Sequence, residues 1–208
     1  MTRLTGMAAA LVLGALGTLA PALADAAGPF GFEMGMTLKQ VQARGLKPEP
    51  LEEPGTYRTA SAPKPHPAFE GYLLAIDPKL GLVSVTGVGK DVACRPTGAE
   101  LRKAFKVLKL TLVARYGEPQ EYDGLEPGSE LGGPDEWMAA LVADERALAL
   151  FWGLDPGPED RPLPDHIARI ALVAYASQPE VGYLKLTYEF TNQEAAEAAA
   201  SEAVGETL

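Results

Sequence analysis

The sequence predicts an α+β fold in which two capped helices pack on an antiparallel sheet. Two segments begin with a capping motif and end at a glycine, which is the pattern of a short and a long α-helix. Several other segments alternate apolar and polar residues, as strands with one buried face do. Loops rich in proline and glycine separate these segments and mark their boundaries.

The start of the chain carries the three parts of a secretory signal peptide in the right order. Arg3 supplies the positive charge, residues 7–19 form the apolar core, and Ala22-Leu23-Ala24 is the small-x-small pattern at which a signal peptidase cuts. The alternative is an uncleaved membrane anchor, against which Pro21 argues because it breaks a helix. We therefore expect cleavage near Ala24, a mature chain that starts at Asp25, and a periplasmic or secreted location.

The expected domain organisation has three parts. Residues 1–24 are the signal peptide, residues 25–192 form a single α+β domain, and residues 193–208 form an Ala/Glu-rich tail that starts as a helix and then frays. Within the domain, submodules 28–92 and 93–192 each contain a capped helix, a proline-rich loop and antiparallel strands. This pattern indicates either a tandem α-β-β repeat or two common motifs that follow each other by chance.

The first submodule is expected to open with an extended segment and a short helix. Thr37 and Gln40 form a capping box, so a helix should cover residues 38–44 and end at Gly45. Met36 and Val41 occupy the positions of a hydrophobic staple around this start. Before the helix, alternation predicts a short extended segment with three apolar residues on one face: Phe30, Phe32 and Met34.

The rest of the first submodule predicts a loop and a pair of strands. Residues 47–67 are rich in proline and charge, which indicates a loop with a brief strand around Tyr57. Strands are expected at residues 69–76 and 82–88, joined by a turn at residues 77–81. In the second strand, Val83 and Val85 alternate with Ser84 and Thr86, which predicts one buried face.

The second submodule is expected to start with the longest helix. Thr97 and Glu100 form a second capping box, which predicts a helix over residues 98–116 that ends at Gly117. Spacings of three and four define an apolar stripe along this helix: Leu101, Ala104, Phe105, Leu108, Leu112 and Tyr116.

Three or four further strands are expected after the long helix. Residues 118–134 and 155–164 are predicted to be loops, and residues 144–146 a hairpin turn. Trp137 and Trp152 are interpreted as core residues, or as a binding surface if they are exposed beside Phe30 or Phe32. The predicted strands cover residues 137–142, 147–152, 167–176 and 182–190.

The charge of the chain restricts its partners. With 28 acidic and 18 basic residues, the formal net charge is −10, which disfavours the polyanionic surfaces of nucleic acids and anionic membranes. We expect another envelope protein as the partner, no nucleic acid, and no stable membrane insertion after cleavage. The basic face of the long helix, formed by Arg102, Lys106 and Lys109, is either a solvated face or a docking site for an acidic partner.

Residue types that support catalysis or metal binding are sparse. Cys94 is the only cysteine, so it is interpreted as a buried thiol or as one end of an intermolecular bridge. His66 and His166 form no motif with it, so neither a Cys–His nucleophile nor a zinc site is predicted. The acidic segments 121–126 and 155–160 lack the alternating oxygen ligands of a calcium loop.

No phosphate-binding loop is predicted, because residues 87–90, GVGK, are too short and lack the following Ser or Thr. Carboxylates that could form an acid–base pair are too numerous to single one pair out. The sequence therefore assigns no catalytic residue, no metal ligand and no binding residue, and we expect no cofactor.

Two short motifs carry a resemblance to known proteins. Residues 30–41, FGFEMGMTLKQV, and residues 112–119, LVARYGEP, resemble segments of uncharacterised small exported bacterial proteins. The helix-plus-antiparallel-strand pattern is more distantly similar to the outer-membrane assembly lipoproteins and the β-lactamase-inhibitor proteins. The resemblance implies an exported α+β protein, and it transfers no functional residue. The chain departs from the lipoproteins because no cysteine lies at the predicted cleavage point.

Two functional hypotheses follow. The first is a non-enzymatic periplasmic binding or interaction protein, because an export signal and an α+β scaffold occur without a catalytic constellation. An inhibitor of an envelope enzyme is a subclass of this hypothesis. The second is an envelope hydrolase that uses carboxylates in a cleft between the two submodules. A concave patch with exposed aromatic residues would favour binding, and a close carboxylate pair would favour catalysis.

Overall fold

The computed structural model describes residues 28–154 and 162–205 and shows a mixed α+β protein. The predicted signal peptide, its cleavage point and the acidic segment 155–160 lie outside the described residues. None of the helices in the described part is both long enough and apolar enough to cross a bilayer.

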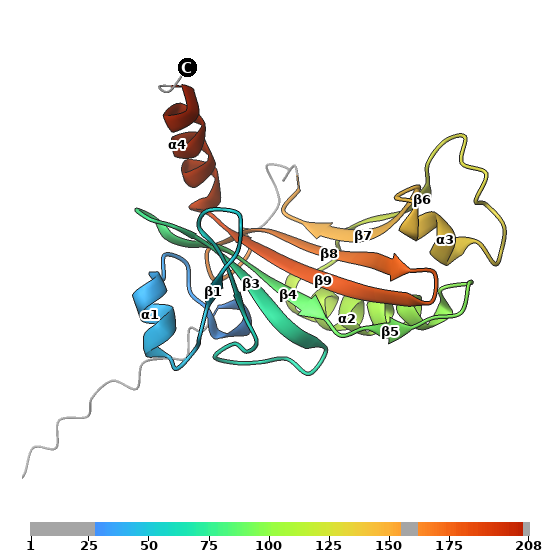
Figure 1. The fold of residues 1–208 in the computed structure, drawn as a ribbon, viewed down its shortest axis with the longest axis horizontal. Helices are drawn as coiled ribbons and strands as arrows, with labels where there is room; N and C mark the ends of the chain where they lie inside the picture. Colours follow the sequence, from blue (N-terminus) through green and yellow to red (C-terminus); the bar gives the residue numbers. More distant parts are fainter. Residues whose placement is uncertain (1–27, 155–161, 206–208) are drawn as a thin grey trace, which may run out of the picture.

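A single antiparallel sheet forms the centre of the molecule (Figure 1). Its strands follow the order β1-β2-β3-β4-β9-β8-β7-β6, and β5 pairs with β9 beside this path. The strands are β1 (Glu49–Pro50), β2 (Thr56–Thr59), β3 (Phe69–Asp77), β4 (Gly81–Gly89), β5 (Val92–Ala93), β6 (Gln120–Leu125), β7 (Arg146–Trp152), β8 (Ile167–Gln178) and β9 (Val181–Phe190).

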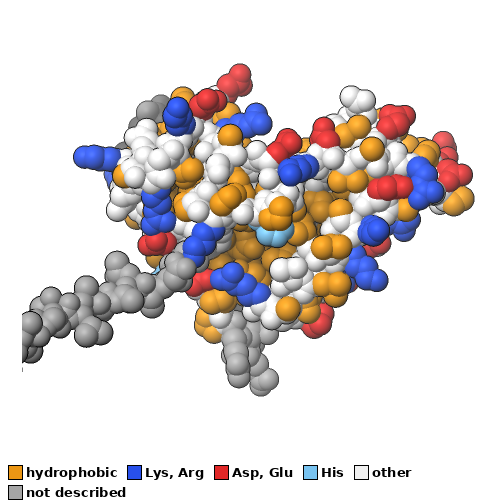
Figure 2. All heavy atoms as spheres, turned by 90° about the horizontal axis from the view of Figure 1, so that it is seen from below, with side chains coloured by type: hydrophobic (Ala, Val, Ile, Leu, Met, Phe, Trp, Pro, Cys, Tyr) orange, Lys and Arg blue, Asp and Glu red, His pale blue; other side chains and the backbone are white. Residues whose placement is uncertain are grey.

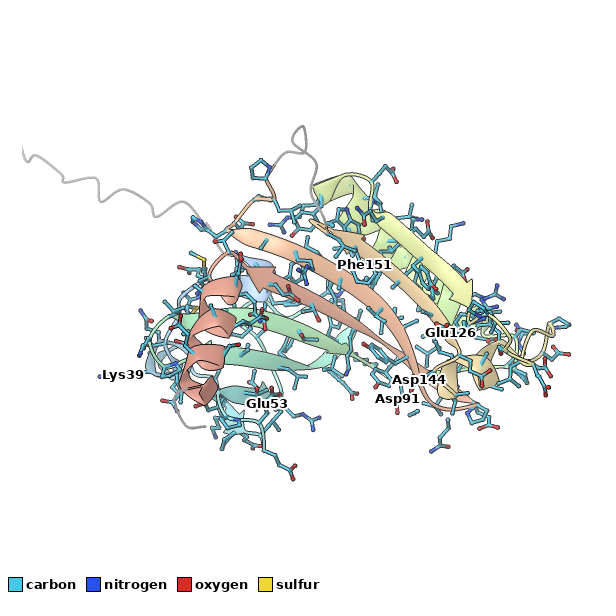
Figure 3. The ribbon with its side chains drawn as sticks, turned by 90° about the horizontal axis from the view of Figure 1, so that it is seen from above. Lys39, Glu53, Asp91, Glu126, Asp144 and Phe151 are labelled. Atoms are coloured by element: carbon cyan, nitrogen blue, oxygen red, sulfur yellow. The ribbon has the colours of Figure 1, made fainter. Side chains whose placement is uncertain are left out.

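The helices lie on and around this sheet. The long helix α2 (Ala99–Tyr116) packs against one face, in contact with β5, β8 and β9, and is hidden beneath the strands in Figure 3. The 3-10 helix η1 (Pro29–Gly31) and α1 (Leu38–Ala43) lie at one end of the sheet, α3 (Trp137–Val142) at the other, and α4 (Gln193–Gly205) projects away from it (Figure 1). On the face opposite α2, Phe151 of β7 is half-buried (Figure 3).

Strands from both predicted submodules share the sheet. β4, from the segment 28–92, pairs with β9, from the segment 93–192, in a register that places Val85 opposite Tyr188. One continuous ladder therefore connects the two segments. The tandem α-β-β repeat stays a prediction.

The predicted strand alternation and helix stripe are confirmed. Every second side chain is buried between Ile170 and Ala174 of β8 and between Leu184 and Phe190 of β9, and these buried side chains belong to the core against which α2 packs. Four residues of the predicted helix stripe are buried, and Ala104 and Tyr116 pack partly buried against the same core. The amphipathic faces of helix and sheet pack together because each removes apolar surface of the other from water.

The first capping box is also confirmed. The Gln40 backbone N–H donates to Thr37 Oγ1 at 3.3 Å, and the Thr37 backbone N–H donates to Gln40 Oε1 at 2.8 Å. Met36 and Val41, the predicted staple residues, are both buried. This helix start is specified locally, which is why the sequence reveals it.

The extended segment predicted around Phe30 is wrong. Residues 29–31 form the 3-10 helix η1, and Phe30 has a left-handed backbone with φ 56°. This conformation is costly for a bulky side chain. It is stabilised here because the Phe30 ring packs against three other aromatic rings that come from distant strands.

The second predicted capping box is wrong as well. The N-cap of α2 is Gly98, with φ 65°, and Glu100 instead accepts a hydrogen bond from the Arg95 backbone N–H at 3.0 Å. A Cβ atom at Gly98 would lie 2.1 Å from Trp137 Cε3. Packing of Trp137 over this turn therefore selects a glycine cap in place of a threonine cap.

Three predictions between residues 118 and 146 are wrong. Residues 137–142, predicted as a strand, form α3. Residues 144 and 145, predicted as part of a hairpin turn, connect that helix to β7, which begins at Arg146. Residues 120–125, predicted as part of a loop, form the edge strand β6. That strand is mostly exposed and polar, so no apolar alternation marks it, and its backbone pairing with β7 defines it.

Candidate functional site

A cavity of about 320 Å³ lies between η1, the loop before β3, the end of α2 and the inner face of β9. Figure 2 shows hydrophobic side chains gathered in a hollow on this side of the molecule, with both basic and acidic side chains around it. The apolar wall is formed by Phe30, Phe69, Leu108, Leu112, Leu186 and Tyr188. This volume is at the lower end of the range that small-molecule sites occupy.

Phe30 is the centre of an aromatic cluster in this wall. Its ring centroid lies 4.9 Å from that of Tyr72, 5.2 Å from Phe69 and 5.6 Å from Tyr188, all in edge-to-face arrangements. Gly87 of β4 makes room for this cluster, because a Cβ atom there would lie 2.9 Å from both Phe30 Cζ and Phe69 Cδ1. The Phe30 ring is thus packed edge-to-face against each of its three neighbours.

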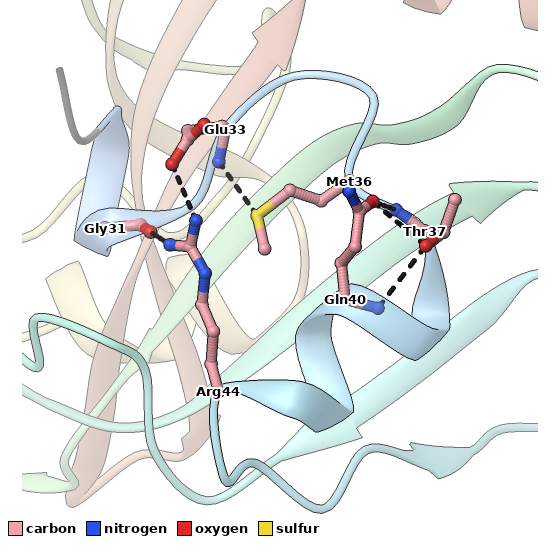
Figure 4. Close-up of polar contacts among 6 residues, drawn as sticks. All are labelled: Gly31, Glu33, Met36, Thr37, Gln40 and Arg44. Atoms are coloured by element: carbon pink, nitrogen blue, oxygen red, sulfur yellow. Dashed lines mark hydrogen bonds and ion pairs between the residues drawn. The ribbon is translucent and has the colours of Figure 1, made fainter. Parts of the chain in front are cut away.

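The short helix α1 holds η1, and therefore Phe30, in place (Figure 4). Arg44 Nη1 donates to the Gly31 carbonyl oxygen at 2.6 Å, and Arg44 Nη2 contacts Glu33 Oε1 at 2.6 Å. The Glu33 backbone N–H points at the Met36 sulfur at 3.3 Å. The local capping motif of α1 thus positions an arginine that fixes a strained turn on the cavity wall.

The loop before β3 closes another side of the cavity. The Lys64 backbone N–H donates to the Phe30 carbonyl oxygen at 2.9 Å. The His66 backbone N–H donates to Tyr72 Oη at 2.9 Å, and the Ala68 backbone N–H donates to His66 Nδ1 at 3.2 Å. Nδ1 of His66 is therefore occupied as an acceptor. Nε2 is the ring nitrogen that remains for a contact with a ligand.

The C-terminal turn of α2 contributes the remaining wall. Arg115 Nη2 pairs with Asp165 Oδ2 at 2.8 Å, and its guanidinium lies 5.2 Å from the Tyr116 ring centroid. Burial raises the pKa of both Tyr116 and Tyr188, so both phenols are neutral at physiological pH. The Tyr116 hydroxyl is buried and interacts with the Tyr188 side chain, but it makes no hydrogen bond of good geometry within the described structure.

The charged side chains among the described lining residues, Lys64 and Arg115, are both basic. His66 also lines the cavity, and no aspartate or glutamate is among the described lining residues. This lining contrasts with the acidic composition of the whole chain. The lining can hold an apolar body, and its described residues include no pair of carboxylates.

The candidate site residues from the sequence analysis lie in different parts of the structure. His66 lines the cavity, whereas neither Cys94 nor His166 is among the described residues that do so. Cys94 is a buried free thiol that donates to the Val92 carbonyl oxygen at 3.2 Å, and burial raises the pKa of its thiol. Trp137 and Trp152 are both buried, as the core interpretation predicts.

The basic face of α2 is partly neutralised. Lys109 forms an ion pair with Glu121 of β6, and Arg102 lies 5.5 Å from the Trp137 ring centroid while it donates to the Thr97 carbonyl oxygen. Lys106 is exposed. The role of this face as a docking site stays a prediction.

Sequence reasoning missed Phe30, Phe69, Tyr116 and Tyr188 as members of one site. These residues come from four separate elements, and each one individually reads as a core residue. A detectable signal was the glycine at position 87 within a strand pattern, since such a glycine often marks a close approach of another group.

The fold and the cavity define a mixed α+β protein with a small aromatic cavity at one end of its sheet. Comparison of the chain with protein-family models, curated proteins and solved structures finds no match. The likeness to exported bacterial proteins, assembly lipoproteins and inhibitor proteins therefore stays a prediction. Within residues 28–154 and 162–205, no group of three or more His, Cys, Asp or Glu side chains is arranged to hold a metal ion.

Proposed function

We propose that this chain is an exported, non-enzymatic binding protein whose cavity takes a small apolar ligand. The observation that carries the proposal is the aromatic cavity of about 320 Å³ between η1, α2 and β9. The pattern of residues 1–24 supports export to the periplasm or the medium.

The wall of the cavity is suited to binding because it is formed before a ligand arrives. The rings of Phe30, Phe69 and Tyr188 are held against one another, and Arg44 ties down the turn that carries Phe30. A ligand that enters buries apolar surface worth about 25 cal/mol per Å² and orders few additional side chains.

An envelope-protein partner remains a related form of this proposal, in which an apolar side chain of the partner occupies the hollow. The hydrolase alternative needs a close pair of carboxylates in a cleft. Since the described lining of this cavity contains neither aspartate nor glutamate, no observation at this site favours hydrolysis.

Titration with the neutral fluorophore N-phenyl-1-naphthylamine tests the proposal. The full chain should show a saturable rise in fluorescence with one site per molecule, because the dye is apolar and small enough for the cavity. Thr111→Phe should weaken this binding roughly tenfold, since Thr111 is exposed on α2 and lines the cavity, so that a larger ring there narrows its entrance.

Lys106→Phe is the matched control. Lys106 is exposed on the same helix and is not among the lining residues, so the same new side chain should leave dye affinity unchanged. Thermal unfolding of both variants verifies that they fold. An absence of saturable binding by the wild-type chain, or an equal loss in both variants, would overturn the proposed function.

A further inference from the structure

We infer that copies of this chain associate with one another, with helix α4 of one copy docked on the outer face of α2 of the next copy. The outer face of α2 is the line of exposed side chains along the helix that Lys103, Lys106, Val107, Leu110 and Ala114 form. Spacings of three and four residues place these side chains next to one another. The inference goes beyond the proposed function and does not rest on it.

Two large apolar side chains are exposed on the outer face of α2. Val107 is 58% exposed and Leu110 is 63% exposed, the highest values among the exposed large hydrophobic residues of the described chain. The core is contacted by a different side of the same helix, through buried residues such as Leu108 and Leu112. The apolar surface of Val107 and Leu110 is therefore available to a second molecule, which would remove it from water.

The charge of the outer face favours an acidic occupant. Lys103 and Lys106 lie beside the apolar pair, and no ion pair in the described part of the chain includes either lysine. Lys109 of the same helix differs from them, because it is paired with Glu121. Two positive charges that no neighbouring carboxylate offsets complement a negatively charged helix.

Helix α4 supplies such a surface. It carries Glu194, Glu197 and Glu202 and no lysine or arginine, and these three glutamates are exposed and take part in no ion pair of the described chain. Between residues 193 and 202, Ala196 is the one buried side chain. An isolated helix of about this length is only marginally stable in water, so docking on a partner stabilises α4 as well.

The position of α4 makes the contact intermolecular. α4 projects from the side of the sheet opposite α2 (Figures 1 and 3), so it does not reach the outer face of α2 in its own chain. The contact joins two different surfaces, and a pair of copies still has one α4 and one outer face unoccupied. Association through such a heterologous contact continues beyond a dimer, into rings or longer assemblies.

Sedimentation velocity of the purified chain at increasing concentration tests the inference. A contact made by one short helix lies at the weak end of protein interfaces, so the chain should be mostly monomeric near about 10 μM and associated near about 1 mM. Raising the salt concentration from about 50 mM to about 500 mM should weaken the association roughly threefold. A chain that stays monomeric throughout would overturn the inference and leave the outer face to a partner other than a second copy.

One apolar substitution locates the contact. Leu110→Ser should weaken the association at least about tenfold, because the leucine is buried only when copies associate. Val142→Ser is the matched control, since Val142 is also an exposed apolar residue on a helix but lies on α3. Thermal unfolding of both variants verifies that they fold. An equal effect of the two substitutions would contradict docking on α2.

A charge exchange identifies both partners of the contact. The double variants Lys103→Glu with Lys106→Glu, and Glu194→Lys with Glu197→Lys, should each associate roughly tenfold more weakly than wild type, because like charges then meet. An equimolar mixture of the two double variants should recover the association, since α4 of each meets an outer face of opposite charge on the other. If the mixture is as weak as either variant alone, α4 does not dock on this face and the inference is wrong.

Discussion

Two tyrosine hydroxyls near the cavity differ in their hydrogen bonding, and the difference determines what their removal should do. Tyr72 Oη accepts from the His66 backbone N–H, whereas the buried Tyr116 hydroxyl meets the Tyr188 side chain without a hydrogen bond of good geometry. A buried polar group without a well-formed hydrogen bond carries a desolvation cost that is not fully offset.

We therefore expect Tyr116→Phe to leave the free energy of unfolding unchanged or to raise it by up to about 1 kcal/mol. Tyr72→Phe should lower it by about 1–3 kcal/mol, because the His66 N–H loses its acceptor. Urea denaturation of the two variants checks both values. A loss in Tyr116→Phe as large as that in Tyr72→Phe would show that the Tyr116 hydroxyl has a partner in solution.

The surroundings of Gly87 predict whether a substitution by alanine stabilises or destabilises the protein. Where the fold tolerates a side chain, replacing glycine by alanine raises the free energy of unfolding by about 0.4–1 kcal/mol, because the unfolded chain loses conformational freedom. At Gly87 the new methyl group would lie 2.9 Å from Phe30 Cζ and from Phe69 Cδ1, and the strand is paired on both sides. We expect Gly87→Ala to lower the free energy of unfolding by about 1–3 kcal/mol.

Gly132→Ala is the control for this effect. At Gly132 a Cβ atom would meet only Leu125 Cδ2, at an ordinary distance of 3.6 Å. This variant should be neutral or slightly more stable in the same urea experiment. Equal behaviour of the two variants would mean that the aromatic cluster does not restrict β4.

At the scale of a single element, the start of α2 depends on a carboxylate. Hydrogen bonds from the Arg95 backbone N–H and guanidinium lower the pKa of Glu100 to about 2 from an ordinary value of 4.5. The folded state therefore holds fewer protons than the unfolded state between these values. The stabilisation that Glu100 provides is complete above about pH 4.5 and is lost as the pH falls through about 2.

The variant Glu100→Gln should remove this pH dependence. Wild type should be more stable than the variant at neutral pH, and the difference should shrink as the pH falls from about 4.5 to about 2. Thermal unfolding across this range measures the difference, and NMR titration of the Glu100 carboxyl group measures its pKa directly. A difference that stays constant with pH would contradict the assigned role of the carboxylate.

At the scale of the whole molecule, the predicted signal peptide determines which chain we expect to fold. If the signal peptide is cut near Ala24, the mature chain starts only a few residues before η1, the helix that forms part of the cavity wall. Mass spectrometry of the protein recovered from the envelope or the medium should give an N-terminus at Asp25. A recovered chain that still carries residues 1–24 would refute cleavage.

Local patterns in the sequence determined the elements whose stability depends on neighbouring residues. The capping box of Thr37 and Gln40, the stripe of α2 and the alternation of β4, β8 and β9 all involve residues a few positions apart, and all are confirmed. Such patterns work because the periods of helix and strand place these side chains on one face. The α+β class follows from these elements together.

Tertiary structure alone decided the features that depend on distant residues. Trp137 determines the glycine cap of α2, pairing with β7 makes a strand of residues 120–125, and packing against three rings stabilises the left-handed backbone of Phe30. The cavity belongs to this group, since η1, the loop before β3, α2 and β9 each supply part of its wall. The local periodicity of the sequence does not reveal these contacts between distant segments. They form only once the sheet has paired and α2 has packed on it.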